Sequence, residues 1–154
     1  RAIFYARGVL ETVKKLRWCP DIIHCHGWMT ALAPLYIKKA YKDEPSFRDA
    51  KVVFSVFEDD FKESFNADFV NRLVLKGVTK KDMAHLKAPV DYATLCKLAI
   101  DYSDGVIQQS ENVNEEVMEY ARQAGKPILE YQTPETFAEA CNEFYDKVWE
   151  TEQK

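Results

Sequence analysis

The hydrophobic positions of this chain change repeatedly between a helical spacing and an extended one. In residues 2–16, apolar side chains return every three or four positions, as on one stripe of an amphipathic helix. Short apolar runs follow in residues 21–26 and 51–57, and the second run is rich in β-branched and aromatic residues, which favour strands. In chain order, the predicted helices are 2–16, 28–41, 66–76, 91–102, 112–124 and 133–149, and the predicted strands are 21–26, 51–57, 105–110 and 126–131.

Proline and capping residues set the expected boundaries of these elements. Pro20 ends the first helix, and Pro34 predicts that the second one either starts as a separate short helix or is kinked. Asn66 is predicted to cap the third helix. Residues 79–82 have the spacing of a helix cap, and residues 133–134 combine an N-cap threonine with a proline at the first helical position.

The order of these elements predicts the fold class. Apolar strands separated by helical crossovers specify a parallel sheet whose two faces are both covered by helices. We therefore expect an α/β fold with a Rossmann-like parallel sheet and helices on both faces. The sequence contains no G-x-G-x-x-G and no Walker pattern, so it offers no support for a nucleotide site of those two kinds.

Composition narrows the class of protein further. The 154 residues are enough for one ordinary domain, and 47% hydrophobic with 30% charged residues excludes a disordered chain. The net charge of −4 argues against nucleic acid as a partner. No apolar run reaches the roughly 18 residues of a membrane span, so we expect no membrane partner. The four cysteines form no C-x-x-C pair, which predicts free buried thiols and a cytoplasmic protein.

Ligands of open parallel sheets bind outside the carboxyl ends of the strands, which directs attention to residues 24–28. His24 and His26 lie two apart on a strand and should point to the same face. A metal site needs further ligands, and His85 is the remaining histidine, so no metal is expected. Alternation directs Cys25 towards the helix layer, away from the place of a nucleophile.

Two further strand ends leave alternatives open. The acidic run 58–60 is suited to bind a cation or to supply a general base, or it is a solvated acidic loop. Asn112 and the amides after Ser110 are suited to hold an anion at a helix N-terminus, or they form a simple cap. We favour the solvated loop and the simple cap.

Three motifs in the right order resemble a known family. Residues 20–36 read P-D-I-I-H-C-H-G-W-M-T-A-L-A-P-L-Y, and residues 51–55 and 97–110 read K-V-V-F-S and K-L-A-I-D-Y-S-D-G-V-I-Q-Q-S. They are similar to the first-domain motifs of bacterial glycogen synthases and plant starch synthases, in particular P-D-[IV]-[IV]-H-x-H-D-W-H-x-[AG]-L-x-P. The chain looks most like the short glycogen-synthase-like proteins of Bacteroides-type bacteria.

The resemblance implies a partial N-terminal domain of a GT-B glycosyltransferase. Such an enzyme moves glucose from ADP-glucose to an α-1,4-glucan with retention, in cytoplasmic glycogen biosynthesis. ADP-glucose is the donor substrate in this reaction, so no cofactor is implied. Residues 1–154 are then expected to form a single α/β domain truncated at its N-terminal side, with the C-terminal nucleotide-sugar domain absent. The missing first strands would leave an open sheet edge, which allows a homo-oligomer.

The resemblance also suggests the site residues. His24, His26 and Trp28 match the family motif, and with Glu58 they are the expected substrate-binding residues for an α-glucan or another carbohydrate. We assign no catalytic residue from the sequence. Gly27 stands where the family has Asp, and Met29 where it has its active-site His.

Two further strand ends also depart from the family motifs. Residues 57–58 replace a His-Asn pair, and residues 108–110 replace Thr-Val-Ser. Because several polar groups of the cleft are changed together, the sequence also supports a second hypothesis about the function. It is a non-catalytic carbohydrate-binding or regulatory descendant of the family.

Overall fold

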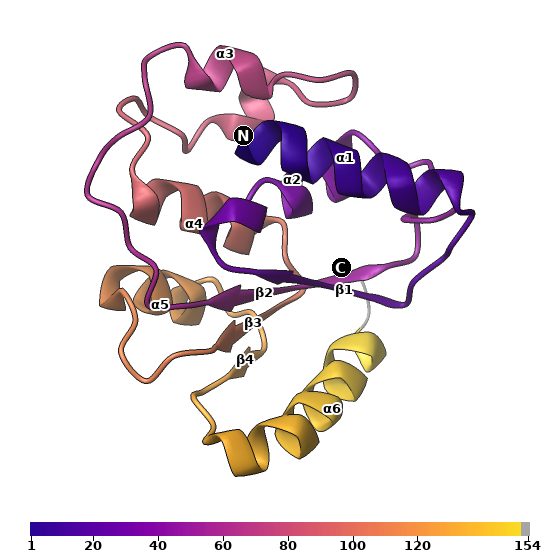
Figure 1. Ribbon diagram of the computed structural model, residues 1–154, viewed down its shortest axis with the longest axis vertical. Helices are drawn as coiled ribbons and strands as arrows, with labels where there is room; N and C mark the ends of the chain where they lie inside the picture. Colours follow the sequence, from indigo (N-terminus) through magenta and orange to yellow (C-terminus); the bar gives the residue numbers. More distant parts are fainter. Residues whose placement is uncertain (152–154) are drawn as a thin grey trace.

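The computed structural model describes residues 1–151, and the strands within this range form a parallel sheet. Its order is β1-β2-β3-β4 (Figure 1). Every neighbouring pair is parallel, which confirms the predicted parallel sheet. The strands are β1 (Ile22–His26), β2 (Lys51–Val56), β3 (Gly105–Gln108) and β4 (Ile128–Leu129).

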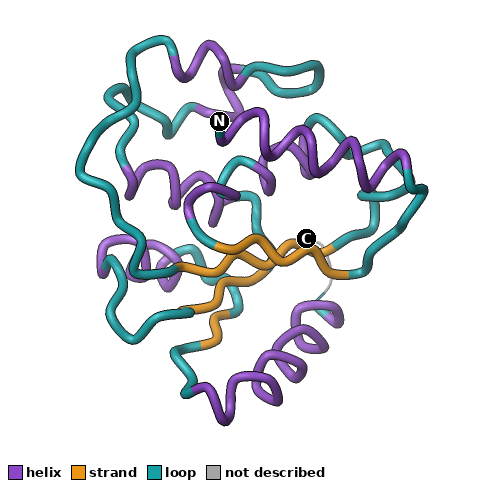
Figure 2. The backbone as a smooth tube through the Cα atoms, in the orientation of Figure 1, coloured by secondary structure: helices purple, strands orange, loops and turns teal. Residues whose placement is uncertain are grey.

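Helices cover both faces of this sheet, which confirms the predicted α/β class. The strands form a central layer, with α6 on one side and the other helices on the opposite side (Figure 2). The α-helices are α1 (Ala2–Lys15), α2 (Ala33–Lys39), α3 (Phe69–Leu73), α4 (Tyr92–Asp101), α5 (Glu115–Gln123) and α6 (Pro134–Glu150), and the 3-10 helices are η1 (Trp28–Thr30) and η2 (Lys80–Met83).

The alternation of side chains along β2 divides the core into two parts. Val52 and Phe54 face the larger core, which contains α2, α4 and α5, whereas Val53 faces a smaller core under α6. Gly105 allows α6 to approach closely, since a Cβ atom there would lie 2.7 Å from Cγ2 of Val148. The sheet is therefore buried on both faces, and its exposed polar chemistry is confined to the strand ends.

The region around Pro34 agrees with the sequence prediction. The helical turn η1 is separate from α2, and Pro34 lies in the first turn of α2, where no intrahelical partner is needed for a backbone N–H. The capping box predicted for residues 79–82 is also confirmed, because Thr79 and Asp82 bond to each other's backbone N–H groups at the start of η2.

Several predicted boundaries were wrong. Within the helix predicted at 66–76, only α3 is helical. Its N-cap is Asp68 rather than Asn66, and it ends early because the backbone becomes extended at Val74. The helix predicted from 112 begins after Asn114, whose Oδ1 accepts from the N–H of Val117. The N-cap at Thr133 is in place, but among the described residues its side chain makes no capping bond to the helix.

The cysteines agree with the prediction only in part. All four are free, and Cys25, Cys96 and Cys141 are buried. Cys19 is exposed, because it lies in the irregular turn after α1, where Arg17 adopts a positive φ of 54°. Within the described residues, no helix is both long enough and apolar enough to cross a lipid bilayer.

Candidate functional site

The carboxyl ends of β1, β2 and β3 lie at one edge of the sheet and are bonded to one another. The backbone N–H of Gly27 donates to Ser55 O at 3.1 Å, and the N–H of Gln109 donates to Val56 O at 2.9 Å. The N–H of Glu58 donates to Oγ of Ser110 at 3.1 Å. The three segments that the sequence singled out therefore meet at this edge, here called the strand-end site.

A tight turn at Gly27 places Trp28 in the strand-end site. Gly27 has φ 71° and ψ 175°, a conformation that is essentially restricted to glycine. The carboxylate of Asp59 fills the space beside it, since a Cβ atom on Gly27 would lie 2.6 Å from Asp59 Oδ2. The same oxygen accepts from the N–H of Trp28 at 3.0 Å, and Oδ1 accepts from the hydroxyl of Tyr92 at 2.8 Å. Burial raises the pKa of Tyr92, so this hydroxyl stays a donor.

Sequence reasoning missed the role of Asp59, which it treated as one residue of an acidic loop. Two of the three carboxylates in that loop bond to other segments of the protein, because the exposed Asp60 Oδ2 also accepts from Nδ2 of Asn114 at 2.8 Å. Among the described residues, no group of three or more His, Cys, Asp or Glu side chains is arranged to hold a metal ion. The acidic run therefore connects loops of the site through Asp59 and Asp60.

His24 and His26 lie on the same face of β1, as predicted, and their rings stack with centroids 3.9 Å apart. His24 is held from both sides: Nδ1 bonds to the hydroxyl of Tyr145 at 2.6 Å, and Nε2 bonds to Oγ of Ser55 at 2.5 Å. Burial, and secondarily the neighbouring His26, lowers the pKa of His24 to about 4. His24 is thus a neutral ring that links β1, β2 and α6.

His26 is exposed at the end of β1, and burial of its ring lowers its pKa. At neutral pH it is therefore an uncharged imidazole, with one nitrogen that donates and one that accepts. Cys25, between the two histidines, is 4% exposed, and burial raises the pKa of its thiol to about 12. This thiol is in the helix-covered core, as alternation predicted, and is protonated at neutral pH.

Aromatic side chains form a groove beside the site. The half-buried ring of Trp28 meets Phe61 edge-on at 5.0 Å and lies 6.3 Å from Phe65. With residues 62–64 these rings line a groove of about 450 Å³. Sequence reasoning did not select Phe61 or Phe65. Phenylalanine recurs every four residues at positions 57, 61, 65 and 69, and this repeat could have identified them.

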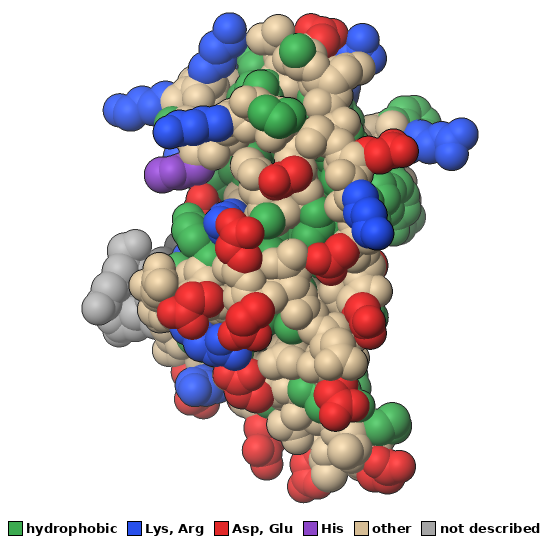
Figure 3. Space-filling view, turned by 90° about the vertical axis from the view of Figure 1, so that its left-hand side faces the viewer, with side chains coloured by type: hydrophobic (Ala, Val, Ile, Leu, Met, Phe, Trp, Pro, Cys, Tyr) green, Lys and Arg blue, Asp and Glu red, His purple; other side chains and the backbone are tan. Residues whose placement is uncertain are grey.

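The strand-end site is acidic. Residues 57–65 contain four carboxylates and one lysine, and Glu58, Asp60 and Glu63 are exposed. Figure 3 views the side of the molecule towards which the strands of Figure 1 point, and acidic side chains gather over its lower half with hydrophobic ones between them. This charge favours neutral or cationic ligands over anions.

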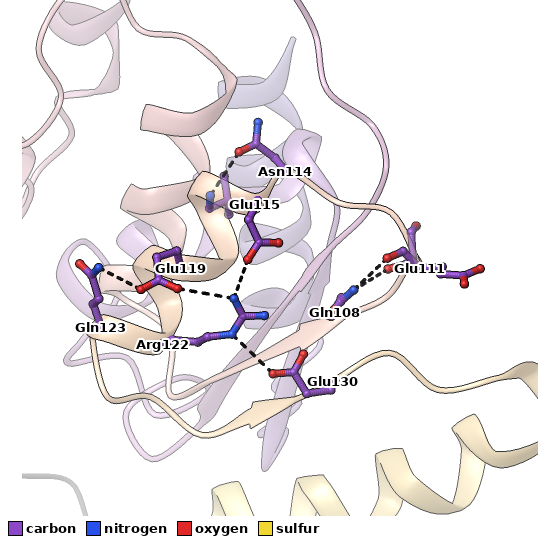
Figure 4. Close-up of polar contacts among 10 residues, drawn as sticks. Gln108, Glu111, Asn114, Glu115, Glu119, Arg122, Gln123 and Glu130 are labelled. Carbon is purple, nitrogen blue, oxygen red and sulfur yellow. Dashed lines mark hydrogen bonds and ion pairs between the residues drawn. The ribbon is translucent and has the colours of Figure 1, made fainter.

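The loop after β3 satisfies its own polar groups. Nε2 of Gln108 donates to the carbonyl oxygens of Ser110 and Glu111, each at 3.1 Å (Figure 4).

Arg122 of α5 contacts Glu115 at 2.8 Å and Glu130 at 3.7 Å, which joins α5 to the end of β4. The helix predicted to start at Asn112 has its N-cap at Asn114, so Asn112 lies before the helix.

Met29 takes part in a different groove. It is half-buried and, together with Leu16 and Trp18, lines an apolar groove of about 600 Å³ along α1. The position at which the resemblance places an active-site histidine thus carries a thioether side chain, which cannot donate a hydrogen bond.

Together, a parallel α/β sheet and a strand-end site with histidines and a tryptophan define a class of proteins in which ligands sit at the carboxyl edge of the sheet. The family described as starch synthase catalytic domain matches residues 1–130. The chain belongs to this family.

Curated relatives agree with this assignment. The chain is 34% identical to the glycogen synthase of Clostridium perfringens over 125 residues, which are 76% of this chain and 24% of that protein. It is 33% identical to the glycogen synthase of Chlorobium chlorochromatii over 137 residues, which are 87% of this chain and 27% of that protein. The chain therefore spans about a quarter of the length of these relatives.

A solved structure supports the fold. The catalytic domain of starch synthase IV from Arabidopsis thaliana, bound to ADP and acarbose, superposes with a TM-score of 0.64 at 19% identity. The match covers 86% of this chain and 29% of that one. It confirms the layered α/β architecture expected for part of a GT-B glycosyltransferase.

Proposed function

We propose that this chain supplies the glucan-binding side of a glucosyltransferase that transfers glucose from ADP-glucose to an α-1,4-glucan. The observation that carries the proposal is the family match over residues 1–130, which includes the His24–Trp28 motif at the end of β1. ADP-glucose is the donor substrate here, and no cofactor is needed.

His26, Trp28 and Glu58 are the residues proposed to contact the sugar. They come from two neighbouring strand ends, and together they offer a neutral imidazole, an aromatic face and a carboxylate that accepts hydrogen bonds. His24 belongs to the same proposed site as the ring that positions His26, because its own nitrogens are bonded to Tyr145 and Ser55.

Transfer by the complete protein is tested by supplying ADP-glucose and glycogen to the protein that carries this chain. Incorporation of glucose above a blank without enzyme supports the proposal. A protein that binds glycogen but incorporates no glucose at any enzyme concentration rules out the transferase function.

A second candidate function is carbohydrate binding or regulation without catalysis. Met29 favours it, since removal of one preorganised donor from a transition state typically costs about 10²–10³ in rate. The acidic strand-end site favours it too, because a nucleotide diphosphate is repelled there.

Glucan binding itself is tested by titrating maltoheptaose against tryptophan fluorescence. We expect the emission to change and the change to disappear in Trp28→Phe. Trp149→Phe, on the exposed face of α6, is the matched control and should keep the response. If the tryptophan emission of the unaltered protein does not change during the titration, carbohydrate does not bind at Trp28.

The cellular location of the protein and its association with itself are also part of this proposal. A cytoplasmic protein of glycogen biosynthesis follows from the proposed activity. A homo-oligomer remains a prediction, and sedimentation velocity over a range of concentrations tests it.

A further inference from the structure

We propose that a lysine-lined groove at the amino ends of the strands binds a small phosphate monoester. This groove, here called the amino-edge groove, has a volume of about 680 Å³. It is lined by the start of β2, the turns before β3 and β4, the end of α2 and Thr151. The strand-end site lies at the opposite edge of the sheet, so this second site goes beyond the proposed function and does not depend on it.

Positive charge gathers in the amino-edge groove of an acidic protein. Four lysines and two aspartates line it, whereas the whole chain has a net charge of −4. Two of the lysines are neutralised within the protein, because Lys38 pairs with Asp104 at 2.8 Å and Lys39 pairs with Asp82 at 3.0 Å. The other two are Lys51 and Lys126, and within the described part of the chain both donate to backbone carbonyl groups rather than to carboxylates.

Lys51 is the strongest indication of a ligand. It is only 6% exposed, although lysine is almost never buried to this degree without a partner of opposite charge. Among residues 1–151 its acceptor is Thr151 O, which lies 2.7 Å from Nζ. An ammonium group has three N–H donors, so two of them remain available. A buried cation on the wall of the groove thus has donors to spare, and a bound anion would offset the cost of its desolvation.

Two neighbouring lysines add further donors. Nζ of Lys126 donates to two backbone carbonyls at 2.9 and 3.3 Å, which leaves one N–H. Nζ of Lys38 contacts Asp104 and the carbonyl of Ala50, which also leaves one. The terminal oxygens of a phosphate group are strong acceptors, and lysine is a common ligand for them. Together with Lys51, these side chains match a phosphate group.

The aspartates of the groove are occupied by other partners. Oδ2 of Asp104 binds Lys38 and also accepts from the N–H of Val52 at 2.8 Å. Oδ1 of Asp101 accepts from the hydroxyl of Tyr120 on α5 at 2.6 Å. These contacts hold both carboxylates away from the lysines that lack an ion pair, so the groove keeps a place for an external anion.

The volume of the groove favours an ester over a bare ion. About 680 Å³ lies within the range of roughly 300–1,000 Å³ that is usual for small-molecule sites. A phosphate ion alone would leave most of this space to water, since one water molecule occupies only about 30 Å³. Tyr102 and Pro127 also line the groove and offer apolar surface to the organic part of an ester.

Calorimetry with inorganic phosphate and with glycerol 3-phosphate tests the site. We expect both to bind, glycerol 3-phosphate with the lower Kd, and we expect added NaCl to raise the Kd because charge holds the ligand.

Lys51→Met and Lys126→Gln should each raise the Kd of glycerol 3-phosphate about tenfold, because each removes a charged donor. Lys15→Gln removes the same charge from an exposed position on α1 and should leave the Kd unchanged. Urea unfolding shows which variants are folded, and Lys126→Gln, at a less buried position, keeps the test decisive if Lys51→Met does not fold.

Three results would overturn the inference. The first is that neither anion binds at millimolar concentration, or that both bind the folded lysine variants as tightly as the unaltered protein. The second is that inorganic phosphate binds as tightly as glycerol 3-phosphate, since the groove then takes a free ion and not an ester. The third concerns Glu152, which lies outside the described residues: Glu152→Gln should leave the Kd unchanged, and binding that appears only in this variant would show that the chain supplies its own anion. None of these results bears on the proposed transfer of glucose.

Discussion

At the scale of single residues, the contact between Gly27 and Asp59 determines the geometry of the site. The chain has glycine where the family motif has aspartate, and the carboxylate of Asp59 from the next strand end occupies the adjacent space. That carboxylate then holds the N–H of Trp28. One residue pair thus sets the exit direction of the chain after β1 and the position of the tryptophan.

We predict that Gly27→Ala destabilises the protein by about 1–3 kcal/mol. The positive φ disfavours a side chain, and the new Cβ atom would lie 2.6 Å from the Asp59 carboxylate. Urea unfolding measures the change. Gly8→Ala is the matched control: no atom lies within 4 Å of its Cβ position in the middle of α1, so a gain of about 0.5–1 kcal/mol is expected. Equal stability of the Gly27→Ala variant and the unaltered protein would contradict the role of this turn.

At the scale of secondary-structure elements, α6 closes the second face of the sheet and lies beyond the residues matched by the family. Phe144 and Val148 pack over Gly105, and Tyr145 bonds to His24. The end of the helix is held as well, because Nζ of Lys51 donates to Thr151 O at 2.7 Å. The helix therefore contributes to the half-buried position of His24 and to its neutral state.

Stability should fall as the pH falls from 6.5 towards 4. In the unfolded chain a histidine takes up a proton near pH 6.5, whereas folded His24 does so only near pH 4. Between these values the unfolded state binds more protons, so acid favours unfolding by roughly 1–3 kcal/mol. The full contribution of His24 is present above pH 6.5.

The measurement is urea unfolding at pH 7 and pH 4.5. His24→Gln should reduce the difference between the two. His26, whose pKa is also lowered, and carboxyl groups with lowered pKa values, such as Asp82, contribute to the slope that remains. His85→Gln, at an exposed position, should leave the slope as it is. An unchanged slope in His24→Gln would show that the buried histidine is not its source.

At the scale of the whole molecule, α1 is apolar on two sides. Its inner stripe, with Ala6 and Leu10, packs against α2 and η1, whereas Phe4 is 83% exposed and Leu16 is 70% exposed on the outside. Trp18, just after the helix, is 61% exposed and lines the same groove. Figure 1 shows α1 above α2, on the side of the sheet opposite α6. Exposed apolar area of this kind is unusual for a surface helix.

We expect the purified chain to increase the fluorescence of anilinonaphthalene sulfonate, a dye that binds exposed apolar surface. The double substitution Phe4→Gln with Leu16→Gln should lower this signal by about half or more, because it removes the two most exposed apolar side chains of the groove. Substitution of Val74, an exposed apolar residue after α3, serves as the control and should have little effect. A dye signal insensitive to the α1 substitutions would place the apolar surface elsewhere.

The sequence by itself determined the α/β class, the parallel direction of the strands and the faces of His24, Cys25 and His26 on β1. These follow from local periodicity, since alternation along a strand fixes which side chains share a face. The motif at residues 20–36 also led to the family, which the match over residues 1–130 confirms. Cap chemistry was readable where both partners lie close in sequence, as with Thr79 and Asp82.

Only the tertiary structure decided how the polar residues are used. The sequence placed His24 among the expected substrate-binding residues, and the structure adds that Tyr145, 121 positions away in the sequence, bonds to one of its nitrogens. Asp59 looked like part of a solvated loop, but it fixes the turn at Gly27 and the hydroxyl of Tyr92. The physical reason is that hydrogen bonds and steric contacts depend on distance in space. Local patterning specifies a face of a strand, but not which distant residue packs against it.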